Sequence, residues 1–284
     1  MMSRVSYMNK ITKEYIKSLS YTDFISFIKE TNRCPGGKSS IREIVHNTFV
    51  EQNCKILDVG SNTGFNSLEF AHITKSKVYG IDISESCVNE ANYTLNKDTE
   101  DVRKRVVFKV GSAYDIPFEQ GYFDLVMCGG ATSFMENKKK AVSEYFRVLK
   151  PWGFLATTQL FYRKKPPEQV LDAVSGIIGA QIKYFNKNDW LNVFNTNNKY
   201  ELYYFKEYKF ENKSRKDVEE YVTMFLQKPH IASLGQEIKK EIYKKWLGYM
   251  ITFTQNNKYL SYFIALFRKN FYLEEKEFFI RERA

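Results

Sequence analysis

The chain has 284 residues, of which 43% are hydrophobic, so it is long enough to bury a sizeable core. It contains no run of about 18 apolar residues and no apolar leader at its start, so we expect no membrane span, no signal peptide and a cytoplasmic location. The four cysteines lie far apart, and the absence of a C-x-x-C pair predicts reduced thiols without a zinc or redox motif.

Lysine and arginine number 43 against 33 acidic residues, which gives a formal net charge of +10. Such a charge raises the question of nucleic acid or an anionic membrane surface as a partner. The basic residues are dispersed, however, and the two denser runs, Lys138–Lys140 and Lys239–Lys245, have the spacing of solvated helix faces. Composition therefore disfavours nucleic acid as the substrate.

The first 50 residues are expected to be helical, because apolar residues in Tyr15–Ile28 recur every three and four positions. The stretch Cys34-Pro35-Gly36-Gly37 then breaks the pattern, and its glycines suit a hinge. From Lys55 onward, short apolar runs alternate with helical stretches: KILDV, KVYGID, RVVFKV, FDLVMC and FLATT. This alternation predicts βαβ units that build a parallel sheet, with ligands bound at the carboxyl ends of the strands.

Beyond residue 158 the pattern predicts helices at about 167–177 and 189–194 and an aromatic strand, YELYYFKEYKF. A helical stretch at 214–255 and a last strand at about 260–267 follow, so the helices form an insertion between the final two strands. We divide the chain into an N-terminal helical lid segment (1–50), a core (51–213), a helical cap insertion (214–256) and a last strand with the C-terminal tail (257–284). Deleting residues 1–30 is expected to spare the fold but to abolish methyl transfer.

The sharpest motif is the turn after KILDV, which Gly60 and Gly64 bracket. Glycines at such a turn let the backbone approach a nucleotide-type ligand closely. A dinucleotide fingerprint would need glycines where Asn62 and Phe65 stand, and the Asp58 carboxylate would repel a pyrophosphate. A carboxylate here suits a ligand that carries an ammonium and a sulfonium, so the turn predicts S-adenosylmethionine rather than a nicotinamide dinucleotide.

The second predicted strand ends in Gly80-Ile81-Asp82, which places Asp82 18 residues beyond Gly64. This is about the offset at which an acidic residue accepts hydrogen bonds from ribose hydroxyls. An isolated Asp after a strand is usually a turn or helix cap. The glycine turn and Asp82 together, in a strand–helix–strand frame, are strong evidence for a cofactor site.

Five segments over roughly residues 50–160, in order LDVGSNTG, GIDIS, GSAYDIPF, FDLVMCGGATSF and YFRVLKPWGFL, resemble the successive motifs of class I S-adenosylmethionine-dependent methyltransferases. The resemblance implies an α/β, Rossmann-like, doubly wound seven-stranded sheet, here with an N-terminal helical lid and a helical insertion before the last strand. It implies cofactor-binding roles for residues at four strand ends. These are Asp58, Gly60, Ser61 and Gly64 for the methionine moiety, Asp82 and Ile83 for ribose and adenine, Ser112 and Ala113 for the adenine edge, and Cys128 and Gly129 beneath the cofactor.

Two positions depart from the family pattern. Ser112 stands where the adenine-edge residue is often acidic, so it supplies a hydrogen-bonding hydroxyl without a charge. Trp152 stands in LKPWGFL where the turn before the fifth strand often has glycine.

Methyl transfer from a sulfonium is an in-line displacement, so the protein must chiefly align the reactants and exclude water. An oxygen nucleophile usually needs a general base, whereas an amine needs only to arrive unprotonated. His230, in the helical insertion, is the candidate catalytic residue, although a loop histidine without a catalytic role is the commoner case. Thr132 and Phe134 after the fourth strand and Tyr15 and Tyr21 from the N-terminal helices are the candidate substrate contacts.

The chain lacks the sequence signatures of several methyltransferases with macromolecular or arsenical substrates. It has no Pro-Pro-aromatic tetrapeptide of amino-methylating nucleic-acid enzymes, no Pro-Cys nucleophile, no paired-glutamate loop and no cysteine cluster. We therefore expect transfer of a methyl group to an oxygen or nitrogen of a small-molecule metabolite, without a metal ion. An RNA- or protein-modifying enzyme and a non-catalytic cofactor-binding protein are the alternatives, and the oligomeric state stays open.

Overall fold

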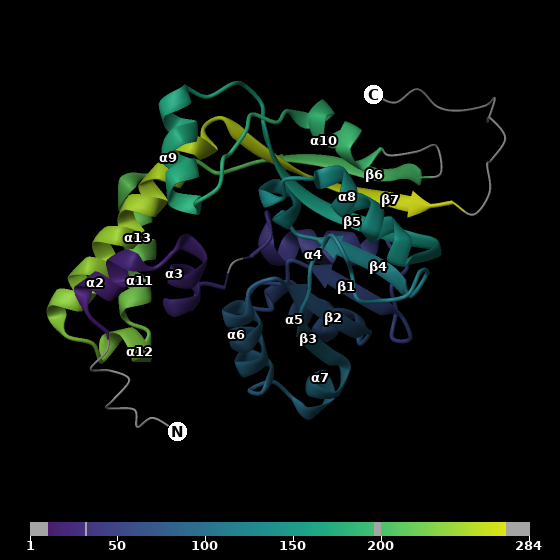
Figure 1. The fold of residues 1–284 in the computed structure, drawn as a ribbon, viewed down its shortest axis with the longest axis horizontal. Coiled ribbons are helices and arrows are strands. Elements are labelled where there is room, and N and C mark those ends of the chain that lie inside the picture. The colour runs from purple at the N-terminus through teal and green to yellow at the C-terminus, as the bar shows by residue number, and fades with distance from the viewer. Residues whose placement is uncertain (1–10, 32, 196–199, 271–284) are drawn as a thin grey trace.

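The computed structural model describes residues 11–31, 33–195 and 200–270 of the chain. These residues form a seven-stranded sheet with helices on both faces and a helical cap beside it (Figure 1). The strand order is β3-β2-β1-β4-β5-β7-β6, with β1 to β5 parallel and β7 antiparallel to both of its neighbours. The strands are β1 (Lys55–Val59), β2 (Lys77–Asp82), β3 (Val106–Val110), β4 (Phe123–Cys128), β5 (Leu149–Tyr162), β6 (Tyr200–Lys209) and β7 (Leu260–Lys269).

This topology confirms the α/β, doubly wound, seven-stranded fold expected from the sequence. The order of the strands reverses between β1 and β4, so their connections leave in opposite directions and open a crevice at the carboxyl ends. The helical insertion lies between β6 and β7, as expected. The glycine turn after β1 and the small residues after β4 therefore meet at one edge of the sheet.

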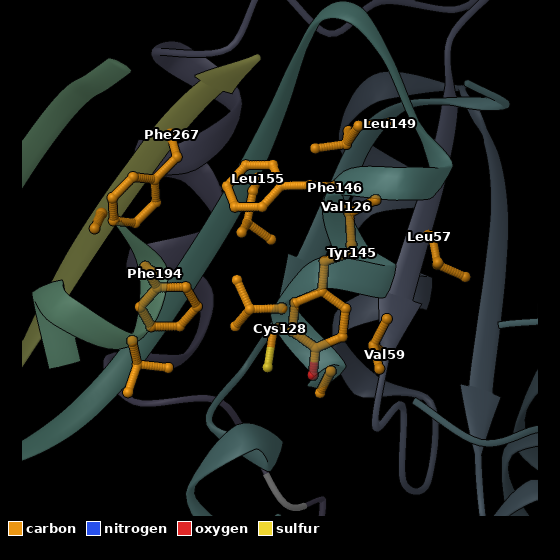
Figure 2. Packing of buried hydrophobic residues seen from close by; sticks show 14 of the residues in the cluster. Leu57, Val59, Val126, Cys128, Tyr145, Phe146, Leu149, Leu155, Phe194 and Phe267 are labelled. Carbon is orange, nitrogen blue, oxygen red and sulfur yellow. The ribbon is translucent and has the colours of Figure 1, made fainter. Parts of the chain in front are cut away.

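Apolar side chains alternate between the two faces of the sheet and bury both. One core lies beneath α8 and α10 and includes Leu57, Tyr145 and Phe194, as Figure 2 shows. The other lies beneath four helices and includes Ile56 and Phe70. The covering helices are α4 (Gly37–His46), α5 (Phe65–Thr74), α6 (Glu85–Leu95) and α7 (Glu100–Arg105) on one face, and α8 (Lys138–Val148) and α10 (Lys187–Phe194) on the other.

The cap combines the N-terminal helices with the insertion, although the two segments lie some 200 residues apart in the chain. They share one hydrophobic core, in which Phe24 and Ile28 pack with Val222 and Trp246. Figure 1 shows these helices gathered to one side of the sheet, with α3 nearest the core domain. The cap helices are α2 (Lys13–Ser18), α3 (Tyr21–Phe27), α11 (Arg215–Leu226), α12 (Pro229–Ala232) and α13 (Gln236–Asn257), and α9 (Glu168–Ile178) contacts both α3 and α13.

Two lysines of the insertion fasten the short N-terminal helices at their ends. The last carbonyls of a helix have no partner within it and need donors from elsewhere. The Lys245 ammonium donates to the carbonyls of Ile16 at 2.7 Å and Leu19 at 2.8 Å, at the end of α2. The Lys228 ammonium donates to the carbonyls of Ile28 and Lys29 at the end of α3. Each lysine thus ties the N-terminal segment to the insertion.

The shared cap core argues against the expectation that residues 1–30 can be deleted without harm to the fold. Their removal would strip α2 and α3 from the shared cap core and expose Trp246, which is 2% exposed in the intact protein. The lid segment and the insertion form one structural unit because neither buries its apolar face alone.

We expect Phe24→Ala to destabilise the protein by about 3–5 kcal/mol, because the ring is fully buried and packs on Trp246 and Tyr249. Urea unfolding followed by tryptophan fluorescence measures the change. Met224→Ala on α11 is the control, because that side chain is 51% exposed and its removal should alter stability by less than about 0.5 kcal/mol. Equal stabilities of the two variants would show that the cap core contributes nothing to folding.

Candidate cofactor and acceptor site

The turn after β1 depends on glycine at both of its ends. Gly60 and Gly64 adopt φ angles of 72° and 91°, the left-handed region that favours glycine. The backbone N–H groups of Gly60 and Ser61 both donate to the Ile81 carbonyl, at 2.8 and 3.0 Å, which fixes the turn against β2. A Cβ at Gly60 would lie 2.3 Å from that of Ala131. The turn is therefore held rigid, with bare backbone at the crevice.

Asp82 is oriented by two backbone donors at the end of β2. Its Oδ2 accepts from the Asn62 N–H at 2.8 Å, and its Oδ1 accepts from the Ser84 N–H at 2.9 Å. Each carboxylate oxygen can accept a further hydrogen bond, so the side chain is pre-oriented for two ligand hydroxyls. Ile83 follows directly and is 80% exposed, an apolar surface beside the carboxylate that suits a flat base.

Asp58 is a buried carboxylate with one oxygen left unpaired. Oδ2 accepts from the Ser67 hydroxyl at 2.7 Å, whereas Oδ1 has no partner and the residue is fully buried. Burial raises the pKa of Asp58 from 3.8 to about 6, against the opposing effect of the Ser67 hydroxyl and the nearby Asn66 side chain. A buried anion of this kind favours a cationic ligand in its vicinity.

Further buried polar atoms without partners lie in the glycine turn, in the first turn of α5 and on β5. They are Ser61 Oγ, Asn66 Oδ1 and Thr158 Oγ1. Buried polar groups in native proteins are almost always hydrogen-bonded, so a cluster of unpaired ones indicates a ligand site. Asn66 and Ser67 were missed by sequence reasoning. The available signal was the pair of polar residues in the first turn of a helix that is buried on most sides.

The segment that links the cap to α4 crosses the glycine turn. The Thr63 hydroxyl lies 3.4 and 3.3 Å from the carbonyls of Glu30 and Thr31. Cys34 is 5% exposed, and its pKa is raised to about 12 by burial and, to a lesser degree, by the nearby Asp58 carboxylate. Its Cβ would lie 3.1 Å from a Cβ at Gly129. Cys34 therefore belongs to the wall of the site, a position that the sequence did not reveal.

The end of β4 divides its residues between the crevice and the core. Gly129 must be small, because a Cβ there would lie 2.7 Å from the Asn66 amide nitrogen. Cys128 and Thr132 are fully buried, with their side chains 2.7 Å apart and the Thr132 hydroxyl 3.1 Å from that of Tyr145. Figure 2 shows the Cys128 sulfur and the Tyr145 hydroxyl at the same end of this core.

Thr132 was expected to contact the substrate, and the structure places it in the core instead. Its hydroxyl is engaged with buried partners, so it supports the 3-10 helix η1 (Ala131–Phe134) from behind. Phe134, at the end of η1, is 53% exposed and free to meet a ligand. Ser112 and Ala113 lie beyond β3, where the Ser112 hydroxyl accepts from the Tyr114 N–H at 3.1 Å and braces the loop.

The three candidate residues from the cap lie within the cap itself. Tyr21 packs edge-on against Phe253 and tilted on Tyr249, and burial raises its pKa to about 12. Tyr15 is 39% exposed on α2 and packs edge-on against Phe27. His230 Nε2 lies 3.0 Å from the Phe27 carbonyl, and burial lowers the pKa of its ring.

The structure therefore gathers Asp58, the glycine turn, Asp82 and Gly129 at one edge of the sheet, and it does not bring His230 to them. In Figure 1, α12 lies at the lower end of the cap, below α11. The His230 contact with Phe27 joins α12 to α3. Among the described residues, no three His, Cys, Asp or Glu side chains are grouped to hold a metal ion.

Comparison with known proteins agrees with this geometry. Residues 57–157 match a family model described as a methyltransferase domain. An uncharacterized protein of Haemophilus influenzae is 27% identical over 61% of this chain and 68% of its own length. A demethylmenaquinone methyltransferase of Leptospira interrogans is 30% identical over 56% of this chain and 60% of its own length.

Solved structures share the fold at lower identity. The MccD protein superposes with a TM-score of 0.71 at 22% identity, covering 84% of this chain and 100% of that one. A phosphoethanolamine N-methyltransferase of Haemonchus contortus, solved with S-adenosylhomocysteine, gives a TM-score of 0.66 at 18% identity, with 89% and 61% covered. Residues 57–157 thus form a methyltransferase domain of the class I S-adenosylmethionine-dependent type, and the cofactor of this domain is S-adenosylmethionine. No described helix is long and apolar enough to cross a membrane.

Asp82→Ala is expected to weaken S-adenosylmethionine binding by about 1.5–3 kcal/mol, the scale of a lost charge-assisted hydrogen bond. Calorimetry on the folded variant measures it. Asp101→Ala is the control, because Asp101 pairs with Arg105 on the surface of α7 and should leave the affinity unchanged. Unchanged affinity in Asp82→Ala would remove that residue from the site.

Asp58→Asn should stabilise the cofactor-free protein at pH 8 and weaken cofactor binding. The pKa of Asp58 is about 6 when folded against 3.8 ordinarily, so its contribution to stability falls as pH rises between these values. The difference between the two pKa values corresponds to a destabilisation of about 3 kcal/mol at most. The neutral amide of asparagine carries no charge and avoids this destabilisation. Denaturation at pH 4 and pH 8 should show the gain only at pH 8. A gain of equal size at both pH values would exclude the buried charge as its cause.

Proposed function

We propose that this protein transfers the methyl group of S-adenosylmethionine to an amine or hydroxyl of a small-molecule metabolite. The observation that carries the proposal is the cap, whose two segments share one core beside the carboxyl edge of the sheet. A lid of this kind excludes water from the reaction and encloses a compact acceptor, which suits a metabolite better than a polymer. The named relatives support it, since one acts on demethylmenaquinone and another on phosphoethanolamine.

In this proposal Asp58, Ser61, Gly60 and Gly64 hold the methionine end of the cofactor. Asp82 and Ile83 hold ribose and adenine, with Ser112 and Ala113 at the adenine edge and Cys128 and Gly129 beneath. The bound cofactor supplies an electrophilic methyl group on a sulfonium. The protein positions the acceptor in line with that group, and the Asp58 carboxylate favours the cationic ligand.

A nitrogen acceptor fits the described site better than an oxygen acceptor. The residues gathered at the carboxyl edge, namely Asp58, the glycine turn, Asp82 and Gly129, include no histidine, and the two carboxylates among them are those assigned to the cofactor. An alcohol would need a general base, whereas an amine that arrives neutral needs none. The rate should then rise with pH toward the pKa of the amine.

Several of the lysines that suggested a polyanionic substrate have partners within the protein. Lys245 binds carbonyls at the end of α2, Lys240 pairs with Glu237, and Lys138 donates to the Met135 carbonyl. These three lysines therefore bind groups of the protein itself. This supports a small-molecule acceptor over RNA.

The proposal predicts turnover with a metabolite and none that depends on RNA. Purified protein should be incubated with S-adenosylmethionine and pooled metabolites, with mass spectrometry used to detect an acceptor that gains one methylene unit and stoichiometric S-adenosylhomocysteine. Asp82→Ala is the matched inactive control. Cofactor binding without turnover in any pool would contradict the proposal, and turnover with RNA alone would favour the modifying enzyme.

A further inference from the structure

A chain of hydrogen bonds lies behind η1, and the orientation of the Gln159 amide gives it a direction. The Thr157 hydroxyl donates to the Cys128 carbonyl at 3.2 Å, and the Gln159 amide nitrogen donates to the Thr157 oxygen at 2.8 Å. The Gln159 amide oxygen then accepts from the Ser133 hydroxyl at 3.1 Å. Gln159 and Thr157 are fully buried.

The orientation of the Gln159 amide sets this direction. Its nitrogen faces Thr157 and lies 4.0 Å from the Cys128 sulfur, so the Thr157 oxygen accepts from Gln159 and its single proton goes to the Cys128 carbonyl. Its oxygen faces Ser133, whose one proton is used in that bond. Ser133 is left with lone pairs and no proton to donate.

Ser133 lies at the carboxyl edge of the sheet, in the segment that follows β4. It is the third residue of η1, which begins directly after Gly129 and Gly130 at the carboxyl end of β4. Of its neighbours, Thr132 is fully buried in the core and Phe134 is 53% exposed. Ser133 is half-buried between them, with its backbone N–H bound to the Gly130 carbonyl at 3.0 Å.

Resting on the function proposed above, we propose that Ser133 accepts a hydrogen bond from the nucleophilic N–H of an amine acceptor, with Gln159 as the residue that keeps it proton-accepting. This bond aims the nucleophile's lone pair away from Ser133 and toward the methyl group. That lone pair forms the new bond to the methyl carbon as the carbon–sulfur bond breaks and its electrons return to sulfur. The surplus proton of an amine acceptor stays on the product nitrogen and is lost to solvent.

The site so arranged selects acceptors that carry a hydrogen on the nucleophilic atom. A tertiary amine has no such hydrogen in its neutral form and would leave the Ser133 lone pairs without a partner, which costs binding free energy. The selectivity between a secondary and a tertiary amine is therefore the property that Ser133 controls.

The test uses the amine acceptor found in the metabolite screen and its N,N-dimethylated analogue, with full-length enzyme. Ser133→Ala should lower kcat/KM for the N–H acceptor by roughly tenfold, the scale of one lost hydrogen bond, and should leave the slow reaction of the analogue unchanged. Ser133→Thr keeps the hydroxyl and should restore most of the rate. Gln159→Leu removes the group that binds the Ser133 proton. It should therefore lower the ratio of kcat/KM for the N–H acceptor to kcat/KM for the analogue, as Ser133→Ala does.

Thr223→Ala is the matched control, because it removes an exposed hydroxyl that donates to the Glu219 carbonyl on α11. Calorimetry should show the same S-adenosylmethionine affinity for every variant. Equal losses with both acceptors, or no loss in Ser133→Ala, would overturn the role of Ser133 while leaving the methyltransferase proposal intact. If the wild-type enzyme binds cofactor but methylates no acceptor, the proposed function fails and this inference fails with it.

Discussion

The buried carboxylate of Asp58 is the constraint on which the site depends. Removing a carboxylate from water is costly, and here one of its oxygens has no partner in the protein. The surrounding structure nevertheless holds it, with the Ser67 hydroxyl on one oxygen and the first turn of α5 packed around it. A fold that carries such a cost at a strand end is arranged for a cationic partner, and the sulfonium and ammonium groups of S-adenosylmethionine supply that charge.

The short helices of the cap depend on contacts with the insertion for their stability. Its helices α2 and α3 are six and seven residues long, too short to be stable alone, and they gain stability from packing and from donors at their ends. The insertion provides both, through the shared apolar core and through Lys228 and Lys245. Because the segment after α3 crosses the glycine turn, the cap and the cofactor site are physically continuous. Glu30 and Thr31, at the end of the cap, contact Thr63 of the turn directly.

The fold alone does not determine the reaction. A [4+2]-cyclase shares this architecture, with a TM-score of 0.66 at 15% identity. The reaction depends on the side chains at the ends of the strands, here those of β4 and β5. In this protein that edge carries the hydroxyl and amide groups of Ser133 and Gln159, which suit a hydrogen-bonding acceptor.

The sequence by itself determined the sheet, the glycine turn and the positions of Asp58 and Asp82, because these depend on local patterns of period and spacing. Even Trp152, in a position where glycine is common, adopts the left-handed φ of 64° that the family pattern implies. Tertiary structure alone decided the rest. Helical spacing could not show that α2 and α3 share a core with α13, that Thr132 faces inward, or that His230 binds a carbonyl of α3. Those outcomes depend on which surfaces meet across some 200 residues of chain, and local periodicity carries no information about that.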